Sequence, residues 1–393
     1  MNKNILNIGP QSFIEKKWDT DIMSVLLQKP QFQGITQKEL AQQLEGKKKS
    51  SQKLPTWFGT QNIYYPNKLN IEQASSERSA AYKSQLVSGE NLLDMTGGFG
   101  VDSYFFSKKV DRVWHCEKNK DLSEIAAHNF KVLEVTNILS SAQDGIEFLK
   151  ETPRHFDWVY IDPSRRDSSQ SRVFKLAECE PNTPQLLDTI FLKTNNLLLK
   201  ASPLLDITQG ISELTFVKEV HVVAVKNEVK ELLFFLEKDF IGDVLIKTIN
   251  LKGDKKETFE FFREEESSAL SAIGAVEQYL YEPNAAILKA GAFRLVGKTY
   301  QLKKLHPNTH LYTSKVLKGF PGRILKVQDA VPYNKKAIRA LGINKANITV
   351  RNFPESVADL RKKYRLKEGG ETYLFFTTVA DGKRIILRCI KVL

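Results

Sequence analysis

The sequence predicts an α/β protein with a doubly wound, mostly parallel sheet, preceded by a helical region and followed by a small α+β domain. Three observations lead to this fold class. Helical patterns fill residues 1–88, apolar strands alternate with helices over residues 89–240, and a basic segment follows. Near-continuous apolar strands separated by helices are typical of parallel sheets covered on both faces. The predicted domains are residues 1–88, 89–265 and 266–393.

The N-terminal region is expected to be mostly helical. TDIMSVLLQ (20–28) and TQKELAQQLEG (36–46) space their apolar residues by three and four after a capping residue. GKKKSSQKLPTW (46–57) interrupts this pattern and predicts a loop. IEQASSERSAAYKSQLV (71–87) then predicts a helix that leads into the central region.

The central region contains five predicted strands, of which the first four are followed by helical patterns. The strands are NLLDMT (91–96), RVWHCEK (112–118), NILSSAQD (137–144), FDWVYIDPS (156–164) and NNLLLKAS (195–202). The helical patterns cover residues 100–109, 121–133, 145–152 and 183–194. Three further strands, at 219–225, 230–237 and 243–251, are expected to complete or extend the sheet, and a helix is expected at 267–281.

The last part of the chain predicts a strand–helix–strand–helix–strand–strand order. The elements are RILKVQDAV (323–331), NKKAIRALG (334–342), ANITVRNF (346–353), PESVADLRKKYRL (354–366), ETYLFFTTV (371–379) and KRIILRCIKV (383–392). The two final strands are joined by ADG, which is a hairpin signal. This order indicates a small α+β module.

The positive charge is confined to the end of the chain. Residues 283–393 hold 23 Lys or Arg and 6 Asp or Glu, a net charge of +17, whereas the whole chain carries +12 and the rest therefore carries −5. Such asymmetry indicates an anionic polymer as partner, and nucleic acid is the usual one. The alternative is a solvated basic surface that keeps the protein soluble.

Composition excludes several other classes of protein. The three cysteines, Cys116, Cys179 and Cys389, show no paired spacing, so neither a disulfide framework nor a Cys-rich zinc site is expected. No apolar run is long enough to span a membrane, and the start of the chain has no apolar signal core. No His, Asp or Glu spacing supports a metal. We expect a soluble, cytoplasmic protein without a metal or a membrane partner.

A glycine-rich turn, DMTGGFGVD (94–102), follows the first strand. In an open parallel sheet, ligands bind beyond the carboxyl ends of the strands, where the strand order reverses. The spacing matches neither the dinucleotide fingerprint G-x-G-x-x-G nor a phosphate-binding P-loop with its Lys-Ser/Thr. Asp94 precedes the glycines instead, and a carboxylate can accept hydrogen bonds from an ammonium group. The turn therefore predicts a zwitterionic ligand rather than a polyphosphate.

Two more acids end the next two strands. Glu117, in HCEKN, stands about twenty residues beyond the turn, where a carboxylate is placed to accept from ribose hydroxyls. Asp144, in AQDG, could accept from the exocyclic amine of an adenine. Each acid alone is more often a turn or cap residue, but three acids at successive strand ends beside a glycine turn indicate a ligand site.

Residues 89–200 resemble the class I S-adenosylmethionine-dependent methyltransferases, a Rossmann-like family. LLDMTGGFGVD matches the first motif of that family, HCEKN its ribose-binding acid and AQDG its adenine-binding acid. The resemblance implies S-adenosylmethionine as cofactor. It implies a cofactor-binding set of Asp94, Thr96, Gly97, Gly98, Gly100, Asp102, Glu117 and Asp144.

YIDPSRRD (160–167) stands where this family has its catalytic motif. Nucleic-acid methyltransferases that modify exocyclic amines often carry Asn- or Asp-Pro-Pro followed by an aromatic residue, which stacks on a flipped base. Here Asp162-Pro163 is retained, but Ser and Arg replace the second proline and the aromatic. We expect Asp162, Pro163 and Arg165 to be catalytic. Arg165 and Arg166 are the expected substrate-binding residues, because a guanidinium can stack on a base or grip a phosphate.

Two alternatives bear on this motif. Arg165 and Arg166 could simply pair with Asp167 or other nearby acids. CEPNT (179–183) is similar to the Cys-x-Pro-x-Thr of RNA uracil methyltransferases, which use a cysteine nucleophile. In that family the cysteine follows the fifth strand, whereas Cys179 precedes it. We therefore leave Cys179 out of the catalytic set.

The basic module is similar in its element order to the RNA-binding THUMP modules of some RNA methyltransferases. It mixes Lys, Arg and His with Tyr and Phe, as in RKKYRLK (361–367), and basic and aromatic side chains serve as phosphate contacts and stacking platforms. The favoured hypothesis is a methyltransferase that modifies a base nitrogen in tRNA or rRNA. The alternatives are a methyltransferase for a small molecule or a protein, and a non-catalytic RNA-binding protein that retains the fold.

Overall fold

The chain divides into two compact units. The computed structural model describes residues 1–165 and 175–392. The first unit comprises Met1–Lys218 and Glu231–Ile241, and the second comprises Glu219–Lys230 and Gly242–Leu393. These units differ from the domains 1–88, 89–265 and 266–393 predicted from sequence. The N-terminal helices share a core with the central region, and the strand at 217–225 pairs with the strand at 245–252 of the second unit.

Residues 1–88 are helical, as predicted. The elements are η1 (Lys3–Leu6), α1 (Ile8–Lys17), α2 (Ile22–Leu26), α3 (Gln37–Lys53), α4 (Pro55–Gly59), α5 (Lys68–Gln73) and α6 (Glu77–Ser84). Helix α3 begins in a capping box of Thr36 and Glu39. The predicted loop at 46–57 is wrong, because α3 continues to Lys53. Lys47, which looked like a loop residue, is 1% exposed; it pairs with Glu15 and donates to the carbonyl of Phe58.

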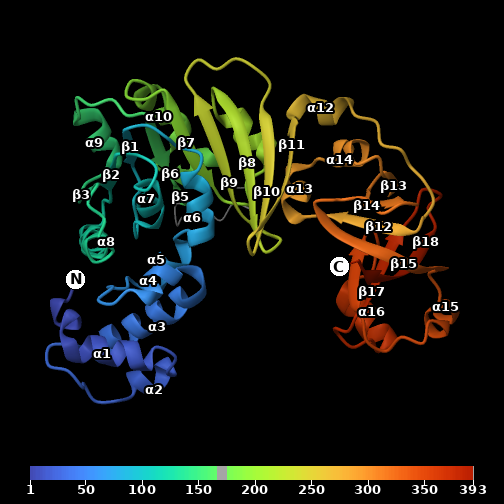
Figure 1. Cartoon of the computed structure of the whole chain (residues 1–393), viewed down its shortest axis with the longest axis horizontal. Helices are drawn as coiled ribbons and strands as arrows, with labels where there is room; N and C mark the ends of the chain where they lie inside the picture. The colour runs from blue at the N-terminus through green and yellow to red at the C-terminus, as the bar shows by residue number, and fades with distance from the viewer. Residues whose placement is uncertain (166–174, 393) are drawn as a thin grey trace. The chain divides into compact units, whose positions relative to one another are not determined.

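The first unit contains a six-strand array in the order β9-β7-β4-β1-β2-β3 (Figure 1). The strands are β1 (Asn91–Asp94), β2 (Arg112–Cys116), β3 (Ile138–Ser141), β4 (Trp158–Ile161), β7 (Asn196–Ala201) and β9 (Glu228–Glu237). The first five are parallel, and β9 runs antiparallel to β7. The predicted mostly parallel sheet is thereby confirmed, and its order reverses between β1 and β4.

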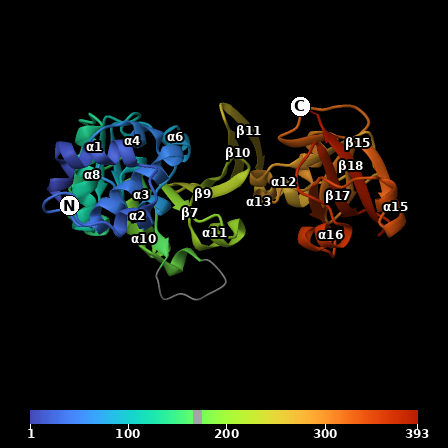
Figure 2. The same ribbon diagram turned by 90° about the horizontal axis from the view of Figure 1, so that it is seen from below.

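Helices connect and cover these strands. They are α7 (Val101–Phe106), α8 (Lys120–Val132), α9 (Gly145–Glu151), α10 (Thr183–Phe191) and α11 (Ile207–Glu213). An apolar cluster joins α7 and α8 to the N-terminal helices, and Trp57 meets Tyr104 edge-on with 4.9 Å between ring centroids. Figure 2 shows the N-terminal helices α1–α4 at the same end of the first unit as α8. Between β4 and α10 lie the short elements β5 (Ser164–Arg165), η2 (Leu176–Glu178) and β6 (Cys179–Glu180).

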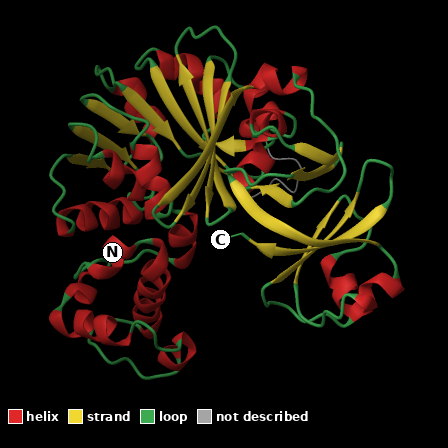
Figure 3. Cartoon of the chain, turned by 45° about the vertical axis from the view of Figure 1, so that its right-hand side comes forward, coloured by secondary structure: helices red, strands yellow, loops and turns green. Residues whose placement is uncertain are grey.

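The second unit contains two groups of strands. The first group, in the order β11-β10-β8, comprises β8 (Val217–Val225), β10 (Leu245–Lys252) and β11 (Lys255–Phe262). The second is a seven-stranded sheet in the order β13-β14-β12-β15-β18-β17-β16 (Figure 3). Its strands are β12 (Tyr279–Pro283), β13 (Lys303–His306), β14 (Thr309–Ser314), β15 (Gly322–Pro332), β16 (Asn347–Arg351), β17 (Thr372–Thr378) and β18 (Arg384–Lys391).

The helices of the second unit are short. They are α12 (Arg263–Ser268), α13 (Ala285–Ala290), α14 (Leu295–Thr299), α15 (Lys335–Ala340) and α16 (Val357–Tyr364). From β15 onward the strand–helix–strand–helix–strand–strand order is confirmed. The helix expected at 267–281 is wrong: α12 ends at Ser268, and the backbone then bonds to β13, with the Lys304 N–H 2.7 Å from the Ala272 carbonyl. No helix in the described part of the chain is long and apolar enough to cross a membrane.

Candidate active site

The site predicted from sequence lies where the strand order reverses. Asp94 ends β1, and Asp162 follows β4, so both stand at the carboxyl edge of adjacent parallel strands. This is the edge at which open α/β sheets bind their ligands. The backbone links the two strand ends further, because the Met95 N–H donates to the Tyr160 carbonyl at 3.0 Å.

Asp94 is an internal residue of the glycine turn. It is 1% exposed, and its two carboxylate oxygens accept from the Thr96 N–H at 3.1 Å and the Ser103 hydroxyl at 2.5 Å. Burial raises the pKa of Asp94 to about 7, and the nearby Asp102 and Asp162 carboxylates act in the same direction. The carboxylate thus orients the turn from inside; its contact with an ammonium group stays a prediction.

The glycines of the turn allow a close approach of backbone and side chains. A Cβ atom on Gly97 would lie 2.2 Å from the His115 Nε2 atom, so no larger residue fits above that buried imidazole. Gly100 has a φ of +85° and precedes α7, a conformation that glycine adopts without strain. The turn is therefore compact and exposes backbone rather than side chains.

Glu117 connects the second strand to this turn. Its carboxylate accepts from the Gly98 N–H at 2.9 Å and from the Asn119 N–H at 2.7 Å. Both oxygens keep a lone pair for a further donor, because each carboxylate oxygen can accept about two hydrogen bonds. The structure thereby brings together the first two sequence motifs, which are about twenty residues apart.

Asp144 follows the third strand and caps α9. It accepts from the Ile146 N–H at 2.7 Å. The next residue, Gly145, packs on the glycine turn, since an added Cβ would lie 2.3 Å from the Met95 carbonyl oxygen. Asp94, Glu117 and Asp144 therefore follow three neighbouring strands along one edge of the sheet.

Asp162 is held at this edge from two sides. Its backbone N–H donates to the Thr96 hydroxyl at 2.7 Å, and one carboxylate oxygen pairs with Lys200 at the end of β7. Burial disfavours the charged form of Lys200, but Asp162 and Asp102 outweigh it and raise the Lys200 pKa. Among the described residues no hydrogen bond ends on the other oxygen of Asp162. That oxygen can accept from a substrate.

Behind Asp162 lies a buried ionic network that the sequence analysis missed. Lys83 of α6 is fully buried and donates to Ser75 at 2.7 Å and Glu231 at 2.8 Å. Asp102 is 3.0 Å from Lys83 and also accepts from the Tyr160 hydroxyl at 2.9 Å. Burial alone would raise the Asp102 pKa, but Lys83 and Lys200 lower it. These bonds place Asp102 inside the domain, and its contact with the cofactor stays a prediction.

One feature of the sequence indicates that such a network exists. Lys200 is the single charged residue of NLLLKA, an otherwise apolar strand, and a buried charge requires a partner. Lys83 and Glu231 carry no comparable signal, because their segments read as an amphipathic helix and a strand end.

The remaining predicted residues lie on the segment after β4. Pro163 is half-buried, and the backbone of Arg165 pairs with Cys179 in the two-stranded β5–β6 ribbon. Arg166 lies outside the described residues, and so does Asp167. Cys179 is 1% exposed.

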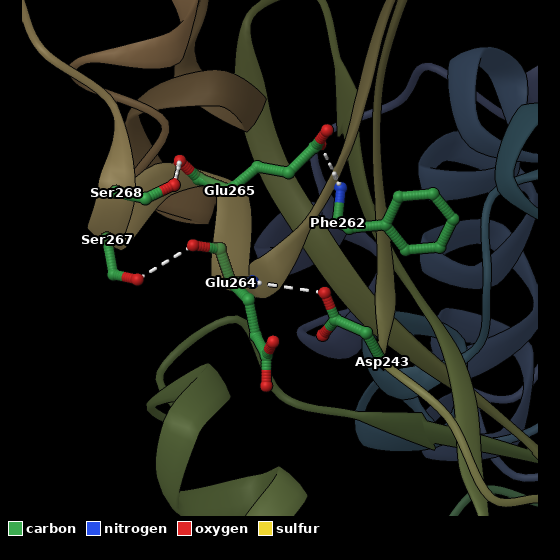
Figure 4. Close-up of a pocket in the computed structure, with 6 residues that line it drawn as sticks. All are labelled: Asp243, Phe262, Glu264, Glu265, Ser267 and Ser268. Atoms are coloured by element: carbon green, nitrogen blue, oxygen red, sulfur yellow. Dashed lines mark hydrogen bonds between the residues drawn. The ribbon is translucent and has the colours of Figure 1, made fainter.

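A pocket of the second unit has a different character. It is lined by Asp243, Phe262, Glu264, Glu265, Ser267 and Ser268 (Figure 4). Two of its three carboxylates bind the chain itself: Asp243 accepts from the Glu264 N–H and Glu265 from the Phe262 N–H. An acidic pocket of this kind does not suit an RNA phosphate.

We predict that Asp94 makes stability depend on pH. The folded chain holds a proton on Asp94 that the unfolded chain releases, so this contribution is complete below pH 3.8 and is lost as the pH rises through about 7. In Asp94→Asn the group cannot ionise. As the pH rises through this window, the free energy of unfolding of the variant should therefore increase relative to that of the native chain, by up to about 1.4 kcal/mol per pH unit. Urea unfolding at pH 5, 6, 7 and 8 measures the difference.

The control for this experiment is Asp188→Asn, at an exposed position of α10. Its free energy of unfolding should match that of the native chain at every pH. Parallel curves for Asp94→Asn and the native chain would show that Asp94 is already ionised in the folded state.

Comparisons with known proteins identify the family of the chain. The crystal structure of a methyltransferase candidate from Porphyromonas gingivalis W83 superimposes with a TM-score of 0.91 over the whole of both chains, at 32% identity. The chain belongs to the class I methyltransferase family. The methyltransferase also shares 32% identity over 92 residues with an uncharacterized RNA methyltransferase of Mycoplasma mobile; the match covers 23% of this chain and 25% of that protein.

Family models match the C-terminal part of the methyltransferase. Residues 279–321 match a ferredoxin-like domain, and residues 322–391 match a THUMP-like domain. The resemblance to RNA methyltransferases with a THUMP-like module, stated from the sequence motifs, is thereby confirmed.

Proposed function

We propose that the methyltransferase transfers a methyl group from S-adenosylmethionine to an exocyclic or ring nitrogen of a base in tRNA or rRNA. The observation that carries this proposal is the placement of Asp162. It follows β4 beside the glycine turn, bonded through its backbone to Thr96 and through its side chain to Lys200.

The residues of the strand edge suit S-adenosylmethionine. Glu117, already oriented by two backbone N–H groups, would accept from the ribose hydroxyls, and Asp144 would accept from the adenine end. The partly exposed backbone of Thr96, Gly97 and Gly98 would hold the methionine part, with the buried Gly100 and Asp94 supporting the turn. When bound, the cofactor supplies an activated methyl group on a sulfonium, so no metal is needed at the acceptor.

Asp162 would orient the acceptor nitrogen. Its open oxygen accepts an N–H of the base, which directs the nitrogen lone pair at the methyl group, and positioning of this kind supplies much of the rate. Lys200 holds the Asp162 carboxylate in place. Arg165 and Arg166 would hold the base or its phosphate.

The C-terminal part would bind the RNA. Its net charge of +17 favours a polyanion, and the THUMP-like match of residues 322–391 favours structured RNA over a small molecule or a protein. An RNA substrate of this kind fits a cytoplasmic protein.

The test is a comparison of modified nucleosides. RNA from cells with and without the gene is digested, and its nucleosides are compared by mass spectrometry. We expect one methylated base to disappear from tRNA or rRNA and to return with the native gene but not with Asp162→Ala. Identical methylation in both RNA pools would contradict an RNA substrate.

A further inference from the structure

Two lysines of the THUMP-like domain stand directly opposite each other. Lys345 and Lys367 form an isolated parallel bridge, in which the Ala346 N–H donates to the Lys367 carbonyl at 3.0 Å and the Lys367 N–H to the Asn344 carbonyl at 2.9 Å. Like charges at directly opposite positions of paired strands destabilise a fold. No ion pair among the described residues includes either lysine. The backbone thus places two lysines at opposed positions, and neither forms an ion pair with a described residue.

A glycine loop lies against this pair. A Cβ on Gly369 would lie 3.3 Å from Lys345 Cε, and one on Gly370 3.7 Å from Lys345 Cγ. Both glycines have positive φ, +97° and +82°. Asn347 donates to the Gly370 carbonyl at 2.7 Å and so anchors the loop beside Lys345. The two glycines carry no side chain, and the acids on either side of them are Glu368, which lies 3.9 Å from Arg361, and Glu371.

Most of the ionisable side chains on the two neighbouring helices are cations. Helices α15 and α16 pack on one face of the sheet through a shared apolar cluster that includes Ile338 and Leu360. Their exposed cations are Lys335, Lys336, Arg339, Lys362 and Lys363. Arg365 follows α16 in a left-handed conformation with φ of +54°, which is uncommon for a residue other than glycine. Of these six, the described residues pair only Lys363 with an acid, Glu355.

An exposed lysine pair could simply spread into water, and that would cost little. Such spreading does not account for the glycine loop, which packs its backbone against the Lys345 side chain. It also does not account for the exposed cations on α15 and α16. An anion between the two ammonium groups accounts for all three features. A polyphosphate backbone fits best, because the cations continue along α15 and α16.

We propose that Lys345 and Lys367, with the Gly369–Gly370 loop, form a phosphate-binding site that docks the backbone of the substrate RNA. This proposal rests on the proposed function, since it names the surface by which the RNA is held. Each lysine would contact one phosphate and release its condensed cation.

The test measures RNA binding as a function of salt. The full-length chain is titrated with 3′-labelled bulk tRNA and, separately, with fragmented bulk rRNA, between 50 and 200 mM salt. For Lys345→Gln/Lys367→Gln the slope of log K against log salt should flatten by about 1 per lysine, with affinity reduced on the order of tenfold. The thermal midpoint should rise slightly, because the repulsion is removed.

Two controls separate the outcomes. Lys345→Arg/Lys367→Arg keeps both charges and should keep the slope. Lys383→Gln removes a lysine that is 79% exposed and paired with Asp381, and should change little. A double glutamine variant that binds like Lys383→Gln would overturn the docking site but leave the RNA substrate intact. A native chain without salt-dependent binding to either RNA would overturn the RNA substrate itself.

Discussion

Substituting Asp162 by alanine is expected to abolish methyl transfer while leaving cofactor binding largely intact. The side chain has one oxygen bonded to Lys200 and would use the other to orient the acceptor nitrogen. Because Asp162 would act by positioning the acceptor nitrogen, losing its side chain should cost on the order of 10²-fold or more in rate. In the variant, Thr96 of the turn still accepts from the residue 162 N–H, because this bond comes from the backbone and not from the side chain.

Single-turnover methylation and calorimetric titration with S-adenosylhomocysteine measure the two properties separately. Asp162→Asn keeps an acceptor oxygen and should retain part of the rate. Asp111→Asn, an exposed carboxylate before β2, is the matched control and should behave like the native chain. Loss of S-adenosylhomocysteine binding in Asp162→Ala would assign Asp162 to the cofactor instead of the acceptor.

Lys83→Met is expected to destabilise the first unit by about 3–5 kcal/mol, the cost of leaving a buried charge without its partner. Lys83 pairs with both Asp102 and Glu231, which are 9% and 2% exposed. The effect should depend on pH. Because Lys83 helps to lower the Asp102 pKa, its contribution is present above the unfolded pKa of 3.8 and is lost as the pH falls.

Tryptophan fluorescence during urea unfolding reports on this unit alone. All four tryptophans, Trp18, Trp57, Trp114 and Trp158, belong to it. Lys49→Met breaks a partly exposed pair with Glu72 and should cost no more than about 1 kcal/mol. Equal losses for Lys49→Met and Lys83→Met would mean that the buried network contributes nothing beyond a surface pair.

The acids that gather along one edge of the sheet could be predicted because their signals are local. A parallel strand that ends in an acid, next to a turn or a helix cap, brings that acid to one edge of the sheet whatever the remaining fold. Asp94, Glu117, Asp144 and Asp162 all follow this rule. The elements from β15 to β18 were predicted correctly for the same reason. The apolar periodicity and capping residues of each element lie within a short segment of the sequence.

The errors came from segments whose lysines or apolar residues have distant partners. Lys47 lies in a lysine-rich segment that was predicted to be a loop. Inside the fold, however, its ammonium group pairs with Glu15 and donates to the Phe58 carbonyl, so α3 can continue through it. The residues before β12 have helical spacing, yet their backbone bonds to β13. Propensity is a weak prior that tertiary contacts override.

By itself, the sequence determined the fold class, the order of elements in the C-terminal module and the acids at the strand ends, because these follow from periodicity and turn chemistry over a few residues. Only the tertiary structure decided which charges meet. Lys83, Asp102 and Glu231 lie up to 148 residues apart. Nothing in the sequence indicates that Lys345 and Lys367 are neighbours, because the bridge that pairs them is formed by backbone atoms alone. Electrostatic energy depends on distance in space, and that distance is set by packing.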